Sequence, residues 1–303
     1  YQEGISLVQG YNTLNIGKNA TGIYGYATNL SNNGDILIQG NNSIGIVGED
    51  SNILNNTGKI IKTDLNESVG IYSLLKTPSI STSLINNGEI NISGDKSLGI
   101  YATTLDSAGT SLGTTTVQNN DKIILGNASD INNAIIGIYG TEGVSVLNGT
   151  GSQIVGGKNA VGIYSEKGNV INDSTINLGD GSVGVYISSG TGDINSASNV
   201  SVGNNGAVAL YVNAGGIITN YSSNISVGSD SVLGYSKDAG TLLDNKGNLS
   251  IGTESVGFYS SGGEITNTGT LTSAGDGVVF FYGNNGKITN SGQINGGANN
   301  YGA

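Results

Sequence analysis

Carboxylates offer the widest scope for acid–base chemistry in this chain of 303 residues, which contains 22 Asp and Glu but no His. Two carboxylates that face each other could cleave a glycosidic bond. The acidic residues are scattered, however, and stand mostly at predicted turns, such as Asp35, Glu89 and Asp180. No carboxylate pair recurs. The sequence therefore predicts a protein that is not an enzyme, and a polysaccharide-degrading activity is the least favoured alternative.

Missing residue types exclude other chemistries. Cys and His are absent, so no Cys/His zinc site, thiol nucleophile or Ser-His-Asp triad can form. All 11 basic residues are Lys, so no guanidinium can clamp a phosphate. The net charge of −11 opposes binding to nucleic acid or anionic lipid. We expect no cofactor, no metal and no nucleic-acid partner.

Helices have almost no place in this sequence. The 52 Gly and 41 Asn make up nearly a third of the chain, and both are poor helix formers. The longest stretch without Gly, residues 71–87, contains Pro78 and is rich in Ser, Thr and Ile. The chain lacks an initiator Met and a signal peptide, so we expect a piece of a longer protein.

A repeat of about 24 residues dominates the chain. Its clearest phrase is Ser-Val-Gly-Ile-Tyr, with variations. Two long spacings interrupt the period, one before and one after Gly99. The phrase is anchored at Gly22, Gly45, Gly70, Gly99, Gly137, Gly162, Gly184 and Gly257, with Ala209, Leu233 and Phe280 in degenerate copies.

Each repeat holds three short segments in which apolar and polar residues alternate, separated by Gly, Asn, Asp or Ser. This alternation predicts strands joined by tight turns. We therefore predict an all-β fold, a right-handed parallel β-helix that occupies residues 1–303 as one unit. It should have about 11–12 coils, three strands per coil and a length on the order of 55 Å.

The alternation also predicts which side chains face the core. Val183 and Val185 should point inward, and Gly184 and Tyr186 outward. In the segment around residue 177, Ile176 and Leu178 should face the core.

An Asn recurs at one corner of the repeat. Stacked Asn side chains can satisfy one another inside a solenoid, because each amide both donates and accepts. We predict a structural ladder, with Ser196 and Asp244 in its two irregular copies. Its members are Asn32, Asn55, Asn86, Asn119, Asn148, Asn172, Asn220, Asn267 and Asn290.

Insertions mark three coils, at about residues 74–83, 103–116 and 128–134. The first two interrupt equivalent positions, so both should emerge from one edge, and the third lies at a different corner. Function in solenoids often sits on such loops, although they could also be neutral decorations. The candidate contact residues are Leu74, Lys76, Pro78, Ile80, Leu105, Asp106, Leu112 and Thr114.

A column of Tyr accompanies the anchor phrase. If the rings face outward, they could bind a sugar or a protein. Identical rings at strand spacing also stabilise a parallel sheet without any ligand, which is the interpretation we favour. The column consists of Tyr24, Tyr72, Tyr101, Tyr139, Tyr164, Tyr186, Tyr211, Tyr235, Tyr259 and Tyr282.

These phrases resemble the passenger regions of large type V (type Va) autotransporter adhesins, above all those of fusobacteria. Residues 265–271 (Ile-Thr-Asn-Thr-Gly-Thr-Leu), 288–294 (Ile-Thr-Asn-Ser-Gly-Gln-Ile) and 161–164 (Val-Gly-Ile-Tyr) carry the resemblance. It implies export across two membranes, attachment to the membrane only through a C-terminal β-barrel missing from this sequence, and display on the bacterial cell surface or release from it.

The resemblance also implies partners: a host cell-surface protein or glycan, or another bacterial cell. It supplies no binding residues. The leading hypothesis is thus a rigid rod that mediates attachment, and the alternative is a stalk without a binding site of its own.

Overall fold

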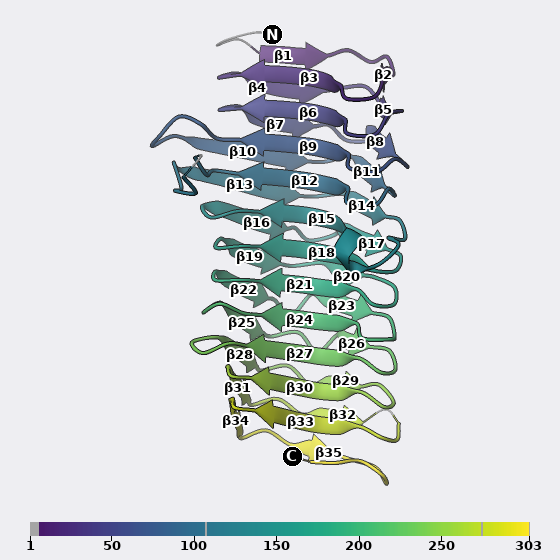
Figure 1. Cartoon of the computed structure of the whole chain (residues 1–303), viewed down its shortest axis with the longest axis vertical. Coiled ribbons are helices and arrows are strands. Elements are labelled where there is room, and N and C mark those ends of the chain that lie inside the picture. Colours follow the sequence, from purple (N-terminus) through teal and green to yellow (C-terminus); the bar gives the residue numbers. More distant parts are fainter. Residues whose placement is uncertain (1–5, 107, 274, 303) are drawn as a thin grey trace.

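The chain folds into a parallel β-solenoid of about 12 turns, with about 24 residues and three strands per turn (Figure 1). The structure is a computed structural model, and it describes residues 6–106, 108–273 and 275–302. Every pairing between named strands is parallel and joins one coil to the next. This architecture confirms the all-β, three-stranded coil predicted from the repeat.

One wall of the solenoid, here the asparagine sheet, is built from strands that end at the recurring Asn, except β1, which ends at Gln9, and β22, which ends at Ile194. It consists of β1 (Ser6–Gln9), β4 (Asn29–Asn32), β7 (Asn52–Asn55), β10 (Ser81–Asn86), β13 (Thr114–Asn119), β16 (Val144–Asn148), β19 (Asn169–Asn172), β22 (Thr191–Ile194), β25 (Ile217–Asn220), β28 (Leu242–Asn245), β31 (Glu264–Asn267) and β34 (Lys287–Asn290).

The next wall, the middle sheet, is paired continuously up to β26 and resumes at β29. It consists of β2 (Leu14–Ile16), β5 (Ile36–Ile38), β8 (Ile60–Thr63), β11 (Glu89–Ile92), β14 (Lys122–Leu125), β17 (Gln153–Gly156), β20 (Thr175–Asn177), β23 (Asn199–Val202), β26 (Ile225–Val227), β29 (Leu249–Ile251), β32 (Leu271–Ser273) and β35 (Ile294–Asn295).

The third wall, the tyrosine sheet, carries the anchor phrase. It consists of β3 (Thr21–Tyr26), β6 (Ile44–Glu49), β9 (Val69–Leu74), β12 (Leu98–Thr103), β15 (Ile135–Gly140), β18 (Ala160–Ser165), β21 (Val183–Ile187), β24 (Val208–Val212), β27 (Val232–Lys237), β30 (Val256–Ser261) and β33 (Val279–Asn284).

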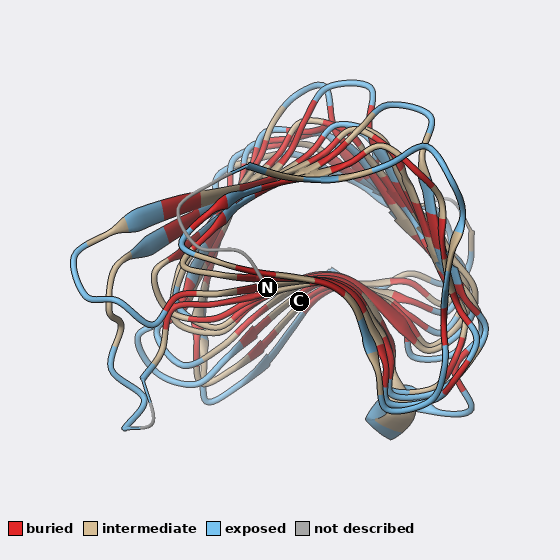
Figure 2. Ribbon diagram, turned by 90° about the horizontal axis from the view of Figure 1, so that it is seen from above, coloured by how far each residue is buried: buried red, intermediate tan, exposed pale blue. Residues whose placement is uncertain are grey.

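The core is a stack of aliphatic columns inside these walls. Ile90, Ile123 and Ile154 follow one another in register in the middle sheet, and all three are fully buried. Figure 2 shows buried residues in every wall, seen along the axis. Because a fully buried Ile contributes roughly 1.5–3 kcal/mol, stability grows with each coil that stacks.

The orientation predicted around the anchor Gly is wrong at two of four positions. Gly184 and Val185 are both buried, whereas Val183 is only half-buried. A Cβ on Gly184 would lie 2.6 Å from Cγ1 of the core residue Val200, so this position faces inward. Two successive inward residues interrupt the alternation, as in a β-bulge. Val185 and Tyr186 face the predicted sides.

The same interruption occurs in the neighbouring coils. Pairing between β12 and β15 passes from Leu98 and Ile136 to Ile100 and Ile138 and skips the glycines. A column of aliphatic residues therefore lies on the outside of the tyrosine sheet beside the Tyr column. This outward aliphatic column includes Leu98, Ile136, Val161, Val183, Val208, Val232 and Val256.

Turn geometry explains part of the unusual composition. The residue at the corner before the tyrosine sheet repeatedly has a positive φ, as in Asn19, Asn42, Asn159 and Asn205. Asn tolerates this left-handed conformation better than most residues. Apart from one 3-10 turn, η1 (Ile131–Asn133), the described residues hold no helix, and therefore none that could cross a membrane.

Candidate binding surfaces

The predicted Asn side chains lie inside one corner and bond to one another along the axis. Nδ2 of Asn86 donates to Oδ1 of Asn119 at 2.9 Å, and Nδ2 of Asn119 donates to Oδ1 of Asn148 at 2.9 Å. Nδ2 of Asn119 also donates to the Asp121 carbonyl at 2.9 Å. The same bonds join Asn32, Asn55 and Asn86, then Asn148 and Asn172, and finally Asn220, Asn245, Asn267 and Asn290.

Burial makes these residues unsuitable for a ligand. Each is at most 1% exposed except Asn290, which is exposed in the last paired strand. A buried amide without a partner would cost about 1–3 kcal/mol, and the stack avoids this cost. Their role in the fold is structural.

Two members of the predicted column are wrong. Ile194, not Ser196, lies opposite Asn172 and Asn220, because β22 pairs with its neighbours up to that residue. Asn245, not Asp244, lies opposite Asn220. Ile194 is fully buried, so it divides the ladder into two segments.

A second ladder, of buried Ser, runs along the corner before the tyrosine sheet. Oγ of Ser255 accepts from the backbone N–H of Ser231 at 3.1 Å and donates to the Gly228 carbonyl at 2.9 Å. Ser43, Ser97 and Ser182 make corresponding bonds. Sequence reasoning missed this ladder, although the first residue of the Ser-Val-Gly-Ile-Tyr phrase marks it.

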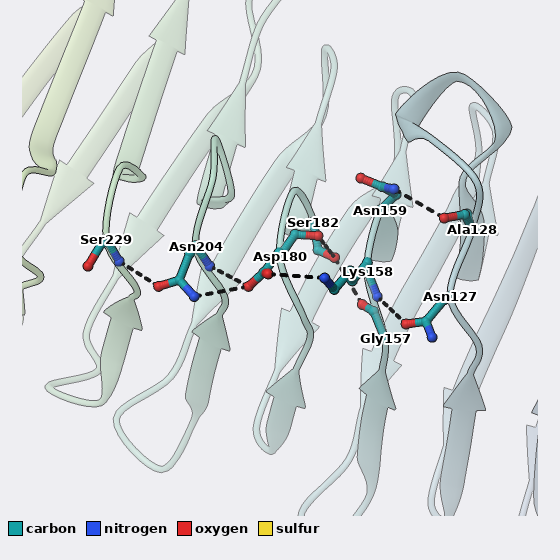
Figure 3. A network of polar contacts seen from close by, with 9 residues as sticks. All are labelled: Asn127, Ala128, Gly157, Lys158, Asn159, Asp180, Ser182, Asn204 and Ser229. Carbon is teal, nitrogen blue, oxygen red and sulfur yellow. Dashed lines mark hydrogen bonds and ion pairs between the residues drawn. The ribbon is translucent and has the colours of Figure 1, made fainter.

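A third set of polar contacts lies on the surface of the same corner (Figure 3). Oδ1 of Asp180 accepts from the backbone N–H of Asn204 at 2.9 Å, and Oδ1 of Asn204 accepts from the N–H of Ser229 at 2.8 Å. The pKa of Asp180 lies below its ordinary value, mainly because of the hydrogen bond from Asn204 and to a smaller extent because of the charge of Lys158. These contacts fasten successive turns together and were also missed.

The candidate residues of the first insertion surround a short turn after β9. Leu74 is half-buried at the end of the strand, Lys76 and Pro78 are exposed, and Ile80 is half-buried. Nζ of Lys76 lies 3.0 Å from a carboxylate oxygen of Glu49.

The preceding coil holds this turn in place. Oδ1 of Asp50 accepts from the backbone N–H groups of Lys76 at 2.6 Å and Thr77 at 3.0 Å, and Oδ2 accepts from the Thr77 hydroxyl at 2.6 Å. Partial burial raises the pKa of Asp50, but the hydrogen bonds from Thr77 and Lys76 outweigh it, so this pKa lies below its ordinary value.

The second insertion forms a small hairpin. Leu105 bridges to Ser111 in antiparallel fashion, and Oδ1 of Asp106 accepts from the N–H of Thr110 at 2.8 Å. Leu105 and Leu112 are half-buried, whereas Asp106 and Thr114 are exposed. Ser107 lies outside the described residues.

The two insertions touch each other. The N–H of Ser79 donates to the Leu112 carbonyl at 2.8 Å, and the hydroxyls of Ser81 and Thr114 lie 2.8 Å apart. Figure 1 shows both projecting beyond the other coils on the same side, before β10 and β13. We call residues 75–80, 104–106 and 108–112 the loop edge. It contains six of the eight candidates, while Leu74 ends β9 and Thr114 begins β13.

The third insertion stands at another corner, between β14 and β15. Asp130 caps η1 by accepting from the N–H groups of Asn132 at 2.8 Å and Asn133 at 3.1 Å. Ile131 of η1 stands over the outer face of the tyrosine sheet. Between them lies an open groove of about 410 Å³, here the η1 groove, lined by Lys96, Leu98, Ile131, Asn132, Ala134, Ile136, Tyr139, Val161, Tyr164, Val183 and Tyr186.

The Tyr column lies in register from Tyr72 to Tyr282, and Val47 separates it from Tyr24. Ring centroids of neighbours are 4.5–5.1 Å apart. Parallel stacking, as between Tyr186 and Tyr211, changes to an edge-to-face contact between Tyr139 and Tyr164. Burial is the main cause that raises the pKa of Tyr72 to about 12, and the charges of the neighbouring Tyr101 and Glu49 add to it. Neighbouring rings thus contact one another, as in an inter-strand stack.

Two carboxylates line one surface depression. Asp173 and Asp193 border a hollow of about 780 Å³ together with Asn195 and Tyr221. The side chain of Asn195 donates to Asp173. No cluster of three acidic residues suited to a metal ion occurs in the part of the chain that the structure describes.

Comparison with known proteins gives no indication of the function, which is therefore inferred from this geometry. No family model matches the chain, and no curated protein or solved structure matches it either.

Proposed function

We propose that this chain is a rod-like adhesin segment whose loop edge attaches a bacterial cell to another surface. The observation that carries the proposal is the contact between the two insertions. Loops from consecutive coils meet through the Ser79–Leu112 hydrogen bond, and Asp50 holds the first of these loops. A neutral decoration has no need of such order, whereas a binding surface gains affinity when its loops are ordered beforehand.

The solenoid suits the role of a spacer. Twelve turns at about 4.8 Å each give a rod on the order of 55 Å. The Asn ladder, the Ser ladder and the surface contacts at Asp180 fasten neighbouring turns. A binding loop on this rod keeps its position relative to both ends.

The loop edge has the chemistry of a polar recognition surface. Hydroxyls from Thr77, Ser79 and Thr110 stand among half-buried aliphatic side chains such as Ile80 and Leu112. Hydroxyls bind sugar or backbone groups through hydrogen bonds, and aliphatic groups add contact area. We propose a glycan or protein on a host cell, or another bacterium, as the partner, and display on the outside of the cell as the location.

A loop-shortened variant tests the assignment. Residues 75–80 and 104–112 are each replaced by the Glu-Lys-Gly connection that joins β18 to β19. We expect loss of binding to cells and to a glycan array, with unchanged circular dichroism. Ile131→Asp, which leaves the loop edge intact, serves as the matched control and should bind normally. Normal binding by the loop-shortened variant would contradict the assignment.

The second candidate is a stalk whose binding site lies elsewhere in the protein. The repeated Asn and Tyr favour it, because both columns have a complete structural explanation. A folded chain that binds no cell, glycan or host ectodomain would support the stalk. Release of reducing sugar from polysaccharides, abolished by Asp193→Asn, would instead support an enzyme.

A further inference from the structure

We propose that the η1 groove binds an amphiphile with one anionic head, its apolar body along the outward aliphatic column and its head at Lys96. This inference is independent of the proposed attachment function. It starts from a surface that alternation did not predict: a line of buried and half-buried aliphatic side chains on the outside of the tyrosine sheet, at positions that were expected to face the core.

The floor of the groove is linear. Leu98, Ile136, Val161 and Val183 occupy the same position in four consecutive coils and pair directly across β12, β15, β18 and β21. Three steps of about 4.8 Å make an apolar strip roughly 14 Å long. The groove volume of about 410 Å³ lies within the range of small-molecule sites. An extended apolar chain fits this strip better than a compact body.

A wall turns the strip into a groove. The capped turn η1 places Ile131 over it, and this side chain is 46% exposed. Asp130 fixes the turn from within, because its carboxylate accepts from two of the turn's N–H groups. The aliphatic column continues through Val208 and Val232, but there residues 203–207 and 228–231 form short turns. A ligand would therefore bind at the η1 groove in preference to the rest of the column.

The charge lies at one end of the floor. Lys96 belongs to the same coil as Leu98, the first of the four, and it is exposed without an ion pair among the described residues. Its acidic neighbours are fixed by hydrogen bonds without an ion pair to Lys96: Oδ1 of Asp95, whose charge attracts Lys96, accepts from the N–H of Ser129 at 2.9 Å, and Asp130 caps η1. An ammonium group at the end of an apolar strip favours a ligand with a single terminal anion.

The test uses two probes that share a chain and differ in head charge, dodecanoate and dodecyltrimethylammonium. Each displaces 8-anilinonaphthalene-1-sulfonate from the full chain, below the probe's micellar concentration. We expect dodecanoate to bind more tightly. Lys96→Glu should weaken dodecanoate binding about fivefold and reverse the preference between the two heads. Ile131→Asp should weaken dodecanoate binding about tenfold, because it removes the apolar wall.

Ile217→Asp is the matched control. Ile217 is 38% exposed on the asparagine sheet, away from the groove, and its substitution should leave dodecanoate binding unchanged. Circular dichroism of each variant verifies the fold. Equal affinity for both probes, or dodecanoate binding that neither Lys96→Glu nor Ile131→Asp weakens, would overturn the proposal and indicate adsorption to apolar surface in general.

Discussion

The side-chain amides of Asn86 and Asn119 hydrogen-bond to each other at 2.9 Å, although 33 residues separate them in the sequence. The hairpin between β12 and β13 projects outward and leaves this contact unchanged. The ladder therefore sets the register of consecutive coils even where their lengths differ. Loops of different lengths between the tyrosine sheet and the asparagine sheet are compatible with the same core.

Replacing one member of the ladder should destabilise several coils. Asn119→Ala removes the partners of Asn86 and Asn148, whose amides stay buried. We expect a loss of roughly 3 kcal/mol in the free energy of unfolding, measured by urea denaturation. Hydrogen exchange should rise first in β10, β13 and β16. Asn120→Ala, an exposed neighbour outside the ladder, should cost under about 1 kcal/mol.

The natural break in the ladder offers a test in the opposite direction. Ile194→Asn places an amide between Asn172 and Asn220, where both have groups that can bond to it. The loss of apolar burial should be largely offset by the two new hydrogen bonds, so the net cost should stay below about 1.5 kcal/mol.

Ile176→Asn is the matched control for this substitution. Ile176 is also fully buried, but it stands in an aliphatic column between Ile154 and Val200. Its amide would have no ladder partner, and the cost should reach roughly 4 kcal/mol. Equal urea midpoints for the two variants would contradict the idea that a column accepts Asn only where it continues a ladder.

The inward position of the anchor Gly makes a further prediction. A Cβ on Gly162 would lie 2.5 Å from the Gly184 carbonyl oxygen and 2.8 Å from Cγ2 of Ile176. Gly162→Ala should therefore destabilise the protein by roughly 1–3 kcal/mol through overpacking. Gly17→Ala is the control, because open space surrounds that position, and it should be neutral or slightly stabilising. The comparison is read from thermal midpoints.

The sequence was sufficient for the period, the three strands per coil and the apolar columns, because these follow from side-chain alternation. It was insufficient at Val183 and Gly184, where two successive residues turn inward. Nothing in a single repeat distinguishes that bulge from regular alternation. The close approach of Gly184 to the next coil, through the Ala209 carbonyl, appears only when coils stack.

The candidate binding surfaces could be predicted less completely than the fold, because they depend on contacts between residues that are far apart in the sequence. Spacing placed the first two insertions on one edge, but the contact between Ser79 and Leu112 required coordinates. The η1 groove combines Ile131 from an insertion with a column whose outward orientation had been predicted wrongly. Ile194 was missed because a turn residue, Ser196, matched the local phrase better than the strand register did.

Stability should fall at alkaline pH because of the Tyr column. Burial raises the pKa of Tyr72 from 10.0 to about 12, and burial also raises the pKa of Tyr101 and Tyr164. Between pH 10 and 12 the folded protein thus holds more protons than the unfolded chain. The stabilisation is complete below pH 10 and is lost as pH rises toward 12.

Thermal midpoints between pH 8 and 12 measure this loss, and absorbance at 295 nm follows the phenolates. Tyr72→Phe should reduce the decline, because it removes one of the shifted groups. A titration in which every Tyr of the folded protein ionises near pH 10 would contradict the prediction.

The attachment of the first loop to the preceding coil depends on one carboxylate. Asp50 accepts three hydrogen bonds from Lys76 and Thr77 and has a positive φ of 50°. Asp50→Gly removes these acceptors without strain, since Gly adopts positive φ readily. We expect faster hydrogen exchange and proteolysis at residues 75–80, with a change in the urea midpoint that is small by comparison. Asp230→Gly, at an exposed position with φ of 54°, is the matched control and should leave the loop protected.

Because the pKa of Asp50 is lowered, wild-type loop protection should be complete above pH 3.8 and decline as pH falls below it.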